Sequence, residues 1–440
     1  MEEMRDLDHS RIFCPTCGVF HPAELVEHDH AVFWRIACPK GVREERLSSD
    51  ATLFRKFRAQ ARPIPDWYRR ALTNCIVHIN DDCSLQCPIC FENAARSGWR
   101  ISSDEFHGLA AHVRKLKPSN VMFTGGEPTE HPLILEFVRE LAKKGGFHCS
   151  VLTNGVRLGR ERNLAADLKE AGLARVSLSF DTFDPKVSEV MRGRGDLVDL
   201  KLKAIENCEA AGLNCGLVTT GCRLSLPEVP KIAAFVIAHA GRMTMYDVQC
   251  FQPVGRVVPG LESVDREEIV KTLVASGVIP GLTEDDFRIS PSVPAAGYCL
   301  HPDCATYLLW LVKDGKAVPI ERELPYAEFV AKMEKMKPGP RWLKWSKFLA
   351  TYVGTFGWRR LAMLRNALGT VEAASTDHLQ MFSVSCLQPP TRLDAQRIGR
   401  CFSGVLTRKG TVCPPCYYYG CRFDQDRRQR GNCGEREETR

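Results

Sequence analysis

Apolar runs alternate with amphipathic stretches from residue 75 to about residue 275. Short runs rich in branched apolar residues predict strands at 75–81, 121–124, 148–153, 174–180, 213–219 and 245–252. Apolar residues with helical spacing predict helices between them, at 104–117, 133–144, 163–171, 198–211, 227–239 and 265–275. This alternation indicates repeated βα units and an α/β fold built on a parallel sheet.

Small polar residues follow several of the predicted strands. Asn154 comes after the third strand, and Ser179 and Asp181 lie on or after the fourth. Ligands of parallel sheets bind at the carboxyl ends of the strands, so these residues are candidates for cofactor binding. The alternative is that they are ordinary turn and strand-cap residues.

Three cysteines follow the first predicted strand in the run DDCSLQCPICF. Cys83, Cys87 and Cys90 have the spacing C-x-x-x-C-x-x-C. Three thiolates around a [4Fe–4S] cube leave one iron without a protein ligand, and a substrate or cosubstrate can bind there. A zinc knuckle is the alternative, although zinc sites more often pair two C-x-x-C arms and close with a fourth ligand.

A second motif, TGGEPT, follows the second predicted strand. Gly125 and Gly126 allow the backbone to approach a small polar ligand, and Glu127, which precedes Pro128, can hold an ammonium group. The motif is weak evidence alone, but it gains weight from its position after the cysteine triplet.

Together the two motifs resemble those of the radical S-adenosylmethionine (SAM) superfamily. The resemblance implies a partial (β/α)6 barrel of the TIM type, with SAM bound to the open iron through its amino and carboxylate groups. It also implies that the GGE segment holds the amino group, and that Ser179 and Asp181 correspond to ribose and carboxylate contacts. A low-potential donor of the ferredoxin or flavodoxin type would reduce the cluster, and SAM cleavage would give a 5′-deoxyadenosyl radical. Ile89 stands where many members have an aromatic residue, which weakens the expectation of adenine stacking there.

Further cysteines precede the predicted barrel, which spans residues 72–285. Cys14, Cys17 and Cys38 predict a mononuclear zinc or iron site in a ribbon-like domain over residues 1–62. We expect Cys75 as the fourth ligand, with His21, His28 or His30 as alternatives. Free thiols are the other interpretation.

A third group of cysteines predicts at least one auxiliary Fe–S cluster in a C-terminal domain, residues 286–440. Such a cluster could relay the electron, contact the substrate, or stabilise a domain with little core of its own. The group consists of Cys299, Cys304, Cys386, Cys401, Cys413, Cys416 and Cys421. Other cysteines, including Cys149 and Cys250, lack partner spacing and are predicted to be core thiols.

The C-terminal domain contains an aromatic, basic segment over residues 341–371, with Trp342 and Trp345 near its start. It predicts either peripheral attachment to anionic lipid or a helix that covers the open side of the barrel. The charged tail, residues 422–440, is predicted to be disordered.

Composition adds the expected compartment. The 440 residues contain 20 cysteines in short-spaced groups, and the charged start has no signal-peptide pattern, so we expect metal binding in a reducing cytoplasm, with possible peripheral contact at the membrane. A formal charge of +7 is modest for this length and does not indicate a nucleic-acid partner.

The order of motifs along the chain, from FCPTC to PPCYYYG, resembles the tetraether lipid synthase-like branch of the superfamily. It implies that Cys299, Cys304, Cys386, Cys401 and Cys416 hold auxiliary clusters, and that the substrate is lipid-like and is joined through a carbon–carbon bond. The chain departs from this branch in two places. It retains only Cys75 of the cysteine-rich stretch that usually precedes the SAM motif, and its CPKG element is shorter than the usual C-P-x-H-G and lacks the histidine. The alternatives are a radical SAM enzyme that methylates a heterocycle or modifies a peptide, and a non-catalytic electron-transfer or zinc-ribbon protein.

Overall fold

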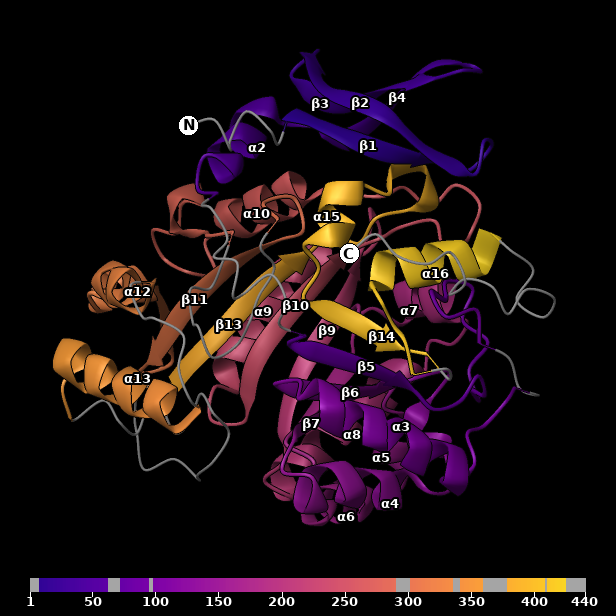
Figure 1. The fold of residues 1–440 in the computed structure, drawn as a ribbon. Helices are drawn as coiled ribbons and strands as arrows, with labels where there is room; N and C mark the ends of the chain where they lie inside the picture. The colour runs from indigo at the N-terminus through magenta and orange to yellow at the C-terminus, as the bar shows by residue number, and fades with distance from the viewer. Residues whose placement is uncertain are drawn as a thin grey trace.

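The computed structural model describes residues 8–61, 72–94, 98–289, 301–334, 341–358, 378–407 and 410–424. Two sheets organise these residues: a four-stranded sheet at the N-terminus and a large eleven-stranded sheet (Figure 1). The large sheet is mostly parallel and carries the site residues described below.

The centre of the large sheet confirms the six predicted strands. Neighbouring strands pair in parallel and in chain order. They are β5 (Asn74–His78), β6 (Asn120–Thr124), β7 (His148–Thr153), β8 (Arg175–Ser179), β9 (Asn214–Gly221) and β10 (Met243–Cys250).

Helices between these strands cover one face of the sheet with apolar side chains. In α3 (Ser103–Leu116) a capping box between Ser102 and Glu105 fixes the first turn, and Leu109 and Val113 face the core. The other helices of this region are α4 (Ile134–Val138), which continues as the wider turns of η3 (Arg139–Lys144), α5 (Val156–Arg160), α6 (Leu164–Ala171), α7 (Pro185–Arg192), α8 (Leu197–Ala210), α9 (Val229–Ala238) and α10 (Arg266–Ala275). Single 3-10 turns lie at η2 (Pro128–Glu130), η4 (Leu226–Glu228) and η5 (Glu284–Asp286).

The C-terminal segment extends the same sheet at both edges. At one edge β13 (His378–Ser385) runs parallel to β10, and β11 (Ala305–Lys313) and β12 (Lys316–Pro319) follow it antiparallel. At the other edge β14 (Ser403–Leu406) runs parallel to β5 and pairs with β15 (Val412–Cys413). The boundary predicted at residue 285 therefore falls within one sheet, because the chain after it returns to pair with the central strands.

The N-terminal sheet is an antiparallel meander of β1 (His9–Cys14), β2 (Val19–His28), β3 (Ala31–Cys38) and β4 (Gly41–Ser48). The helix α2 (Ala51–Arg58), capped by Asp50, follows it. Figure 1 shows β1 above α15 (Ala395–Gly399), and the amide of Phe13 donates to the Leu393 carbonyl at 2.9 Å. This hydrogen bond joins the N-terminal sheet to the C-terminal part of the chain. The 3-10 turn η7 (Pro390–Arg392) directly precedes Leu393.

Of the aromatic segment predicted at 341–371, residues 359–371 lie outside the described residues, and the described part forms α13 (Arg341–Phe356). The helix α13 packs on α12 (Tyr326–Glu334), which follows the short α11 (Ile320–Glu323). Phe329 of α12 contacts Phe348, Tyr352 and Phe356 of α13. These three aromatic side chains of α13 therefore pack against α12. The two helices lie beside β11 at the edge of the sheet (Figure 1). The side chains of Trp342 and Trp345 and the tail beyond residue 424 lie outside the described residues. Among the described helices, none has the length and apolar character needed to span a bilayer.

Candidate active site

The cysteine triplet lies in the loop after β5, at the carboxyl edge of the large sheet. Cys83 is 7% exposed, and Cys87 and Cys90 are partly buried against Val156 and Leu197. Burial raises the pKa of Cys83 and of Cys90, so both are neutral thiols without a metal. Metal binding would release these protons, and the buried sulfurs would keep water from the bound group.

Arg256, after β10, holds the triplet loop in place. Its backbone amide and carbonyl each form a 3.0 Å hydrogen bond with Cys90. Its guanidinium donates to the carbonyls of Cys87 at 3.0 Å and Ala94 at 2.7 Å. The preceding Gly255 has φ of 74°, and a Cβ there would lie 2.2 Å from the Cys90 carbonyl oxygen. Apart from the presence of Arg256 in FQPVGR, nothing in the sequence predicts this contact.

The two glycines of the GGEP motif close on the backbone that leads into the triplet. The Gly126 amide donates to the Asn80 carbonyl at 2.8 Å, and the Glu127 amide donates to the Asp82 carbonyl at 2.7 Å. A Cβ at Gly125 would lie 2.3 Å from the Asn80 oxygen. The sequence predicts that these glycines allow a ligand to approach the backbone. In the structure they instead allow the close approach of the backbone at residues 80–82.

Glu127 is 1% exposed and links this motif to the end of β7. Its carboxylate accepts hydrogen bonds from the Thr129 amide at 3.0 Å, the Thr153 hydroxyl at 2.7 Å and the Asn154 amide at 2.7 Å. Burial raises the pKa of Glu127, against the effect of these donors. The Asn154 side-chain amide lies 3.7 Å from the Cys83 sulfur. The structure thus brings Glu127 and Asn154 to the triplet, with the carboxylate already hydrogen-bonded.

Asp181 forms a buried ion pair with Arg192 of α7. The two guanidinium contacts measure 2.7 and 2.9 Å, and the Thr220 amide also donates to Asp181. Burial raises the pKa of Asp181, but the charge of Arg192 outweighs burial and holds this pKa at about 2. Arg192 also donates to the Ile89 carbonyl in the triplet loop at 3.3 Å. Asp181 therefore positions a cation, and Arg192 rather than Asp181 is the group suited to a ligand carboxylate.

Lys201 of α8 is a second buried cation in this region, and sequence reasoning missed it. It is 4% exposed, and its charge interacts with those of Asp181, Arg192, Cys87 and Glu127. Burial lowers the pKa of Lys201 to about 8. A lysine in an amphipathic helix pattern normally faces solvent, so only the structure shows that this one faces inward. Two buried cations beside three thiols fit an anionic cluster and a cosubstrate that carries a carboxylate.

The remaining predicted cofactor residues lie at the same edge. Ser179 ends β8 and is partly buried, and Pro128 begins η2 directly after Glu127. The carboxyl ends of β5 to β8 thus supply all of the residues predicted to bind the cofactor.

The C-terminal cysteines meet around Arg397 of α15. The Arg397 guanidinium donates to the Cys304 sulfur at 3.3 Å and to the Cys386 carbonyl at 2.6 Å. Burial raises the pKa of Cys401 and of Cys416, and the charge of nearby Arg397 acts against this effect at both thiols. Cys299 and the Cys421 side chain lie outside the described residues.

Cys250, which the sequence predicts to be a plain core thiol, lies beside this group. Its sulfur lies 3.5 Å from that of Cys386. The two meet because β10 and β13 are parallel neighbours, Cys250 is the last residue of β10, and Cys386 directly follows β13. The parallel pairing arises only in the folded sheet, so the spacing in the sequence does not reveal it.

The N-terminal cysteines Cys14, Cys17 and Cys38 also come together, with the Cys38 sulfur 3.7 Å from Cys14 and 3.2 Å from Cys17. Cys75 does not join them, since it lies on β5 in the core of the large sheet. His21 is the fourth residue of this group, and the expectation of Cys75 was wrong because the two sheets separate the residues.

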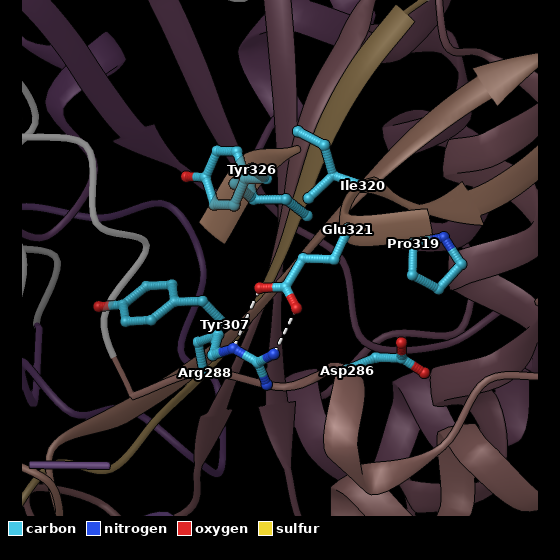
Figure 2. A pocket seen from close by; sticks show the side chains of 8 residues that line it. Asp286, Arg288, Tyr307, Pro319, Ile320, Glu321 and Tyr326 are labelled. Carbon is cyan, nitrogen blue, oxygen red and sulfur yellow. Dashed lines mark hydrogen bonds and ion pairs between the residues drawn. The ribbon is translucent and has the colours of Figure 1, made fainter. Parts of the chain in front are cut away.

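A small cavity elsewhere, at the edge formed by β11 and β12, is lined by Tyr307, Pro319 and Tyr326. Figure 2 shows the Arg288–Glu321 ion pair within it. The pair satisfies both charges, and none of the candidate cofactor residues lines this cavity. It is therefore separate from the candidate active site.

Comparison with known proteins agrees with this geometry. Residues 77–236 match the family model described as the radical SAM superfamily. This span contains the cysteine triplet, the GGEP motif, Arg192 and Lys201. The match and the relatives below indicate that the chain is a radical SAM enzyme.

The chain is 28% identical to the 7,8-dihydro-6-hydroxymethylpterin dimethyltransferase of Methanocaldococcus jannaschii, over 72% of this chain and 71% of that protein. It is 34% identical to a probable GTP 3′,8-cyclase of Pyrococcus abyssi, over 32% of this chain and 45% of the relative. It is also 34% identical to the PqqA peptide cyclase of Rhodopseudomonas palustris, over 40% of this chain and 47% of the relative. Among solved structures, Streptococcus suis SuiB bound to S-adenosylmethionine has a TM-score of 0.38 and 15% identity, covering 47% of this chain and 48% of that one. The chain thus spans about half the length of the two cyclases.

Proposed function

We propose that this radical SAM enzyme joins two carbons of a lipid-like substrate by removing one hydrogen atom from an unactivated C–H bond at each. Each removal would consume one SAM and one electron from the low-potential donor, and the two carbon radicals would pair to form the carbon–carbon bond. The single observation that carries the choice of substrate is a set of partly exposed apolar side chains on the sheet face opposite the helices. Val77, Phe123 and Val248 point into the helix-covered core, so the residues that alternate with them point to the other face. Partly exposed on that face are Met122, Leu152, Val218, Met245 and Met381.

Methionine side chains are flexible and polarisable, and they suit an alkyl chain that has no fixed shape. This face also carries two charged groups, Arg175 and Asp247, whose charges interact. Asp247 already accepts hydrogen bonds from Ser383 at 2.6 Å and Ser385 at 2.8 Å. An apolar substrate can therefore lie along the sheet without leaving Asp247 unpaired.

Each residue of the site has a distinct task in this proposal. Cys83, Cys87 and Cys90 hold a [4Fe–4S] cluster, and Arg192 and Lys201 attract the carboxylate of SAM. When bound, the reduced cluster and SAM supply the primary carbon radical that such a C–H bond requires. Arg256 keeps the loop rigid, and the apolar face excludes water from the reacting carbon, because misplacement or water access would waste the radical.

Methylation of a pterin-like heterocycle is the second candidate, favoured by the named activity of the Methanocaldococcus jannaschii relative. Both candidates share the same radical chemistry and differ in what occupies the methionine-lined face.

Anaerobic reconstitution with iron and sulfide, followed by dithionite and SAM, tests the proposal through the yield of 5′-deoxyadenosine. We expect lipid extract to stimulate turnover, and Cys87→Ala to abolish it. Cys149→Ser is the matched control, since Cys149 lies in the helix-covered core. Equal turnover with and without lipid would refute the lipid assignment, and stimulation by a reduced pterin would support the second candidate.

A further inference from the structure

The N-terminal sheet brings four metal-binding side chains to one point, far in sequence from the cysteine triplet. Cys14 ends β1 and Cys38 ends β3, while Cys17 lies in the turn between β1 and β2. The Gly18 amide donates to the Cys14 carbonyl at 2.8 Å, and Gly18 has φ of 71°, so the turn folds Cys17 back over Cys14.

The distances fit one tetrahedral ion. The ligand atoms of Cys14, Cys17, His21 and Cys38 all lie within 4.8 Å of one another, and two sulfur pairs measure 3.2 and 3.7 Å. Two thiolates on one zinc ion lie about 3.8 Å apart, given Zn–S bonds of about 2.3 Å and tetrahedral angles.

His21 provides the second, independent observation. Its Nε2 atom is buried from water and has no hydrogen-bond partner among the described residues. A buried imidazole nitrogen without a partner is costly, and coordination to a metal would remove that cost. Three thiolates and one imidazole are a common ligand set of closed structural zinc sites.

We propose that Cys14, Cys17, His21 and Cys38 bind a structural zinc ion, and that this zinc fixes the segment that holds the C-terminal cysteines. The segment, residues 387–400, connects Cys386 to Cys401 and includes η7 and α15. We call it the strap.

The strap is attached to β1, the strand that ends in Cys14. The Phe13 amide donates to the Leu393 carbonyl at 2.9 Å, and the Ser10 hydroxyl donates to the Asp394 carboxylate at 2.5 Å. The Gln396 side chain donates to a β1 carbonyl at 2.8 Å. Through these hydrogen bonds the strap lies along β1, which is the edge strand of the N-terminal sheet.

The strap in turn contacts the C-terminal thiols. The Gln388 amide lies 3.4 Å from the Cys416 sulfur, and Arg397 donates to the Cys304 sulfur at 3.3 Å. The Asp394 amide donates to the Gln388 side chain at 2.6 Å, which links the part bound to β1 with the part bound to Cys416. Loss of the zinc would release the end of β1, and with it the strap.

Elemental analysis of the full chain, purified anaerobically, tests the zinc site. We expect about one zinc ion per chain in the wild type and in Cys75→Ser, near zero in His21→Ala, and recovery in His21→Cys, which restores a ligand. Zinc retained in His21→Ala, zinc lost in Cys75→Ser, or a wild type that holds no zinc would each overturn the assignment.

Alkylation followed by mass spectrometry tests the link to the strap on the same samples. We expect Cys304 and Cys416 to react at least several-fold faster in His21→Ala than in the wild type, while the core thiol Cys149 stays unreactive. Equal rates at Cys304 and Cys416 would refute the link. Faster reaction at Cys149 as well would also refute it, because that result means general unfolding. Since SAM cleavage is not the readout, these outcomes are independent of the proposed function.

Discussion

Gly126→Ala is expected to damage the active site through the backbone alone. A Cβ at residue 126 would lie 2.2 Å from the Asp82 carbonyl oxygen, about 1.2 Å short of an ordinary contact of 3.4 Å. The Asp82 oxygen cannot yield independently, because it accepts the Glu127 amide at 2.7 Å and because Cys83 is the next residue. The strand end and the triplet loop must therefore separate.

Two hydrogen bonds cross this contact, from the amides of Gly126 and Glu127. Their loss would cost about 2 kcal/mol of stability, at about 1 kcal/mol for each bond. A displacement near 1 Å at Cys83 would lower the rate of SAM cleavage by about 100-fold, since the reacting groups need close alignment.

The assay combines iron content, anaerobic formation of 5′-deoxyadenosine and chemical denaturation. Gly108→Ala is the matched control, because Gly108 lies within α3 and a Cβ there meets no atom within 4 Å. The control should keep full activity and gain up to about 1 kcal/mol of stability. If Gly126→Ala matches Gly108→Ala in iron content and rate, the close approach does not position the cluster and our reasoning is wrong.

Three further changes test the surroundings of the triplet. The Lys201 ammonium is charged below its pKa of about 8, so SAM binding should weaken as the pH rises through 8. Lys201→Met should weaken SAM binding and remove this pH dependence. Titration calorimetry measures both effects. Asp181→Asn should lower SAM affinity by about tenfold with iron content unchanged, because Arg192 loses the ion pair that orients it. Cys250→Ser should lower the iron content but keep the triplet's spectroscopic signal, because the Cys250 sulfur lies 3.5 Å from Cys386, within reach of a shared metal atom.

Controls for these variants come from the same elements. Lys203→Met removes an exposed lysine of α8 that pairs with Glu206, so SAM binding should keep its pH dependence. Cys149→Ser removes a thiol from the helix-covered core and should keep its iron. A control that behaves like its test variant would contradict the assigned role of Lys201 or Cys250.

The central strands were predictable because each is a short apolar run followed by an amphipathic helix, and local patterning fixes both. The grouping of Cys83, Cys87 and Cys90 was predictable because the three residues share one loop. The sequence does not predict the positions of Arg192, Lys201 and Cys250, since these depend on which strands and helices become neighbours in space.

The same limit explains the errors at the two ends of the chain. Cys75 has the right residue type for the N-terminal site, but it lies on a strand of the other sheet. The strands β13 and β14 were missed because their pairing joins residues more than 130 positions apart, as Met245 with Met381 and Asn74 with Ser403 show. Pattern along the chain does not encode such contacts.

The pairing of β14 with β5 has a consequence for biosynthesis. The strand β5 and the cysteine triplet leave the ribosome more than 300 residues before β14 does, as the positions of Asn74 and Ser403 show. Until then the first strand of the large sheet has an unpaired edge next to the triplet loop. Iron and sulfide would therefore have access to Cys83, Cys87 and Cys90 from this open edge until the last strands dock.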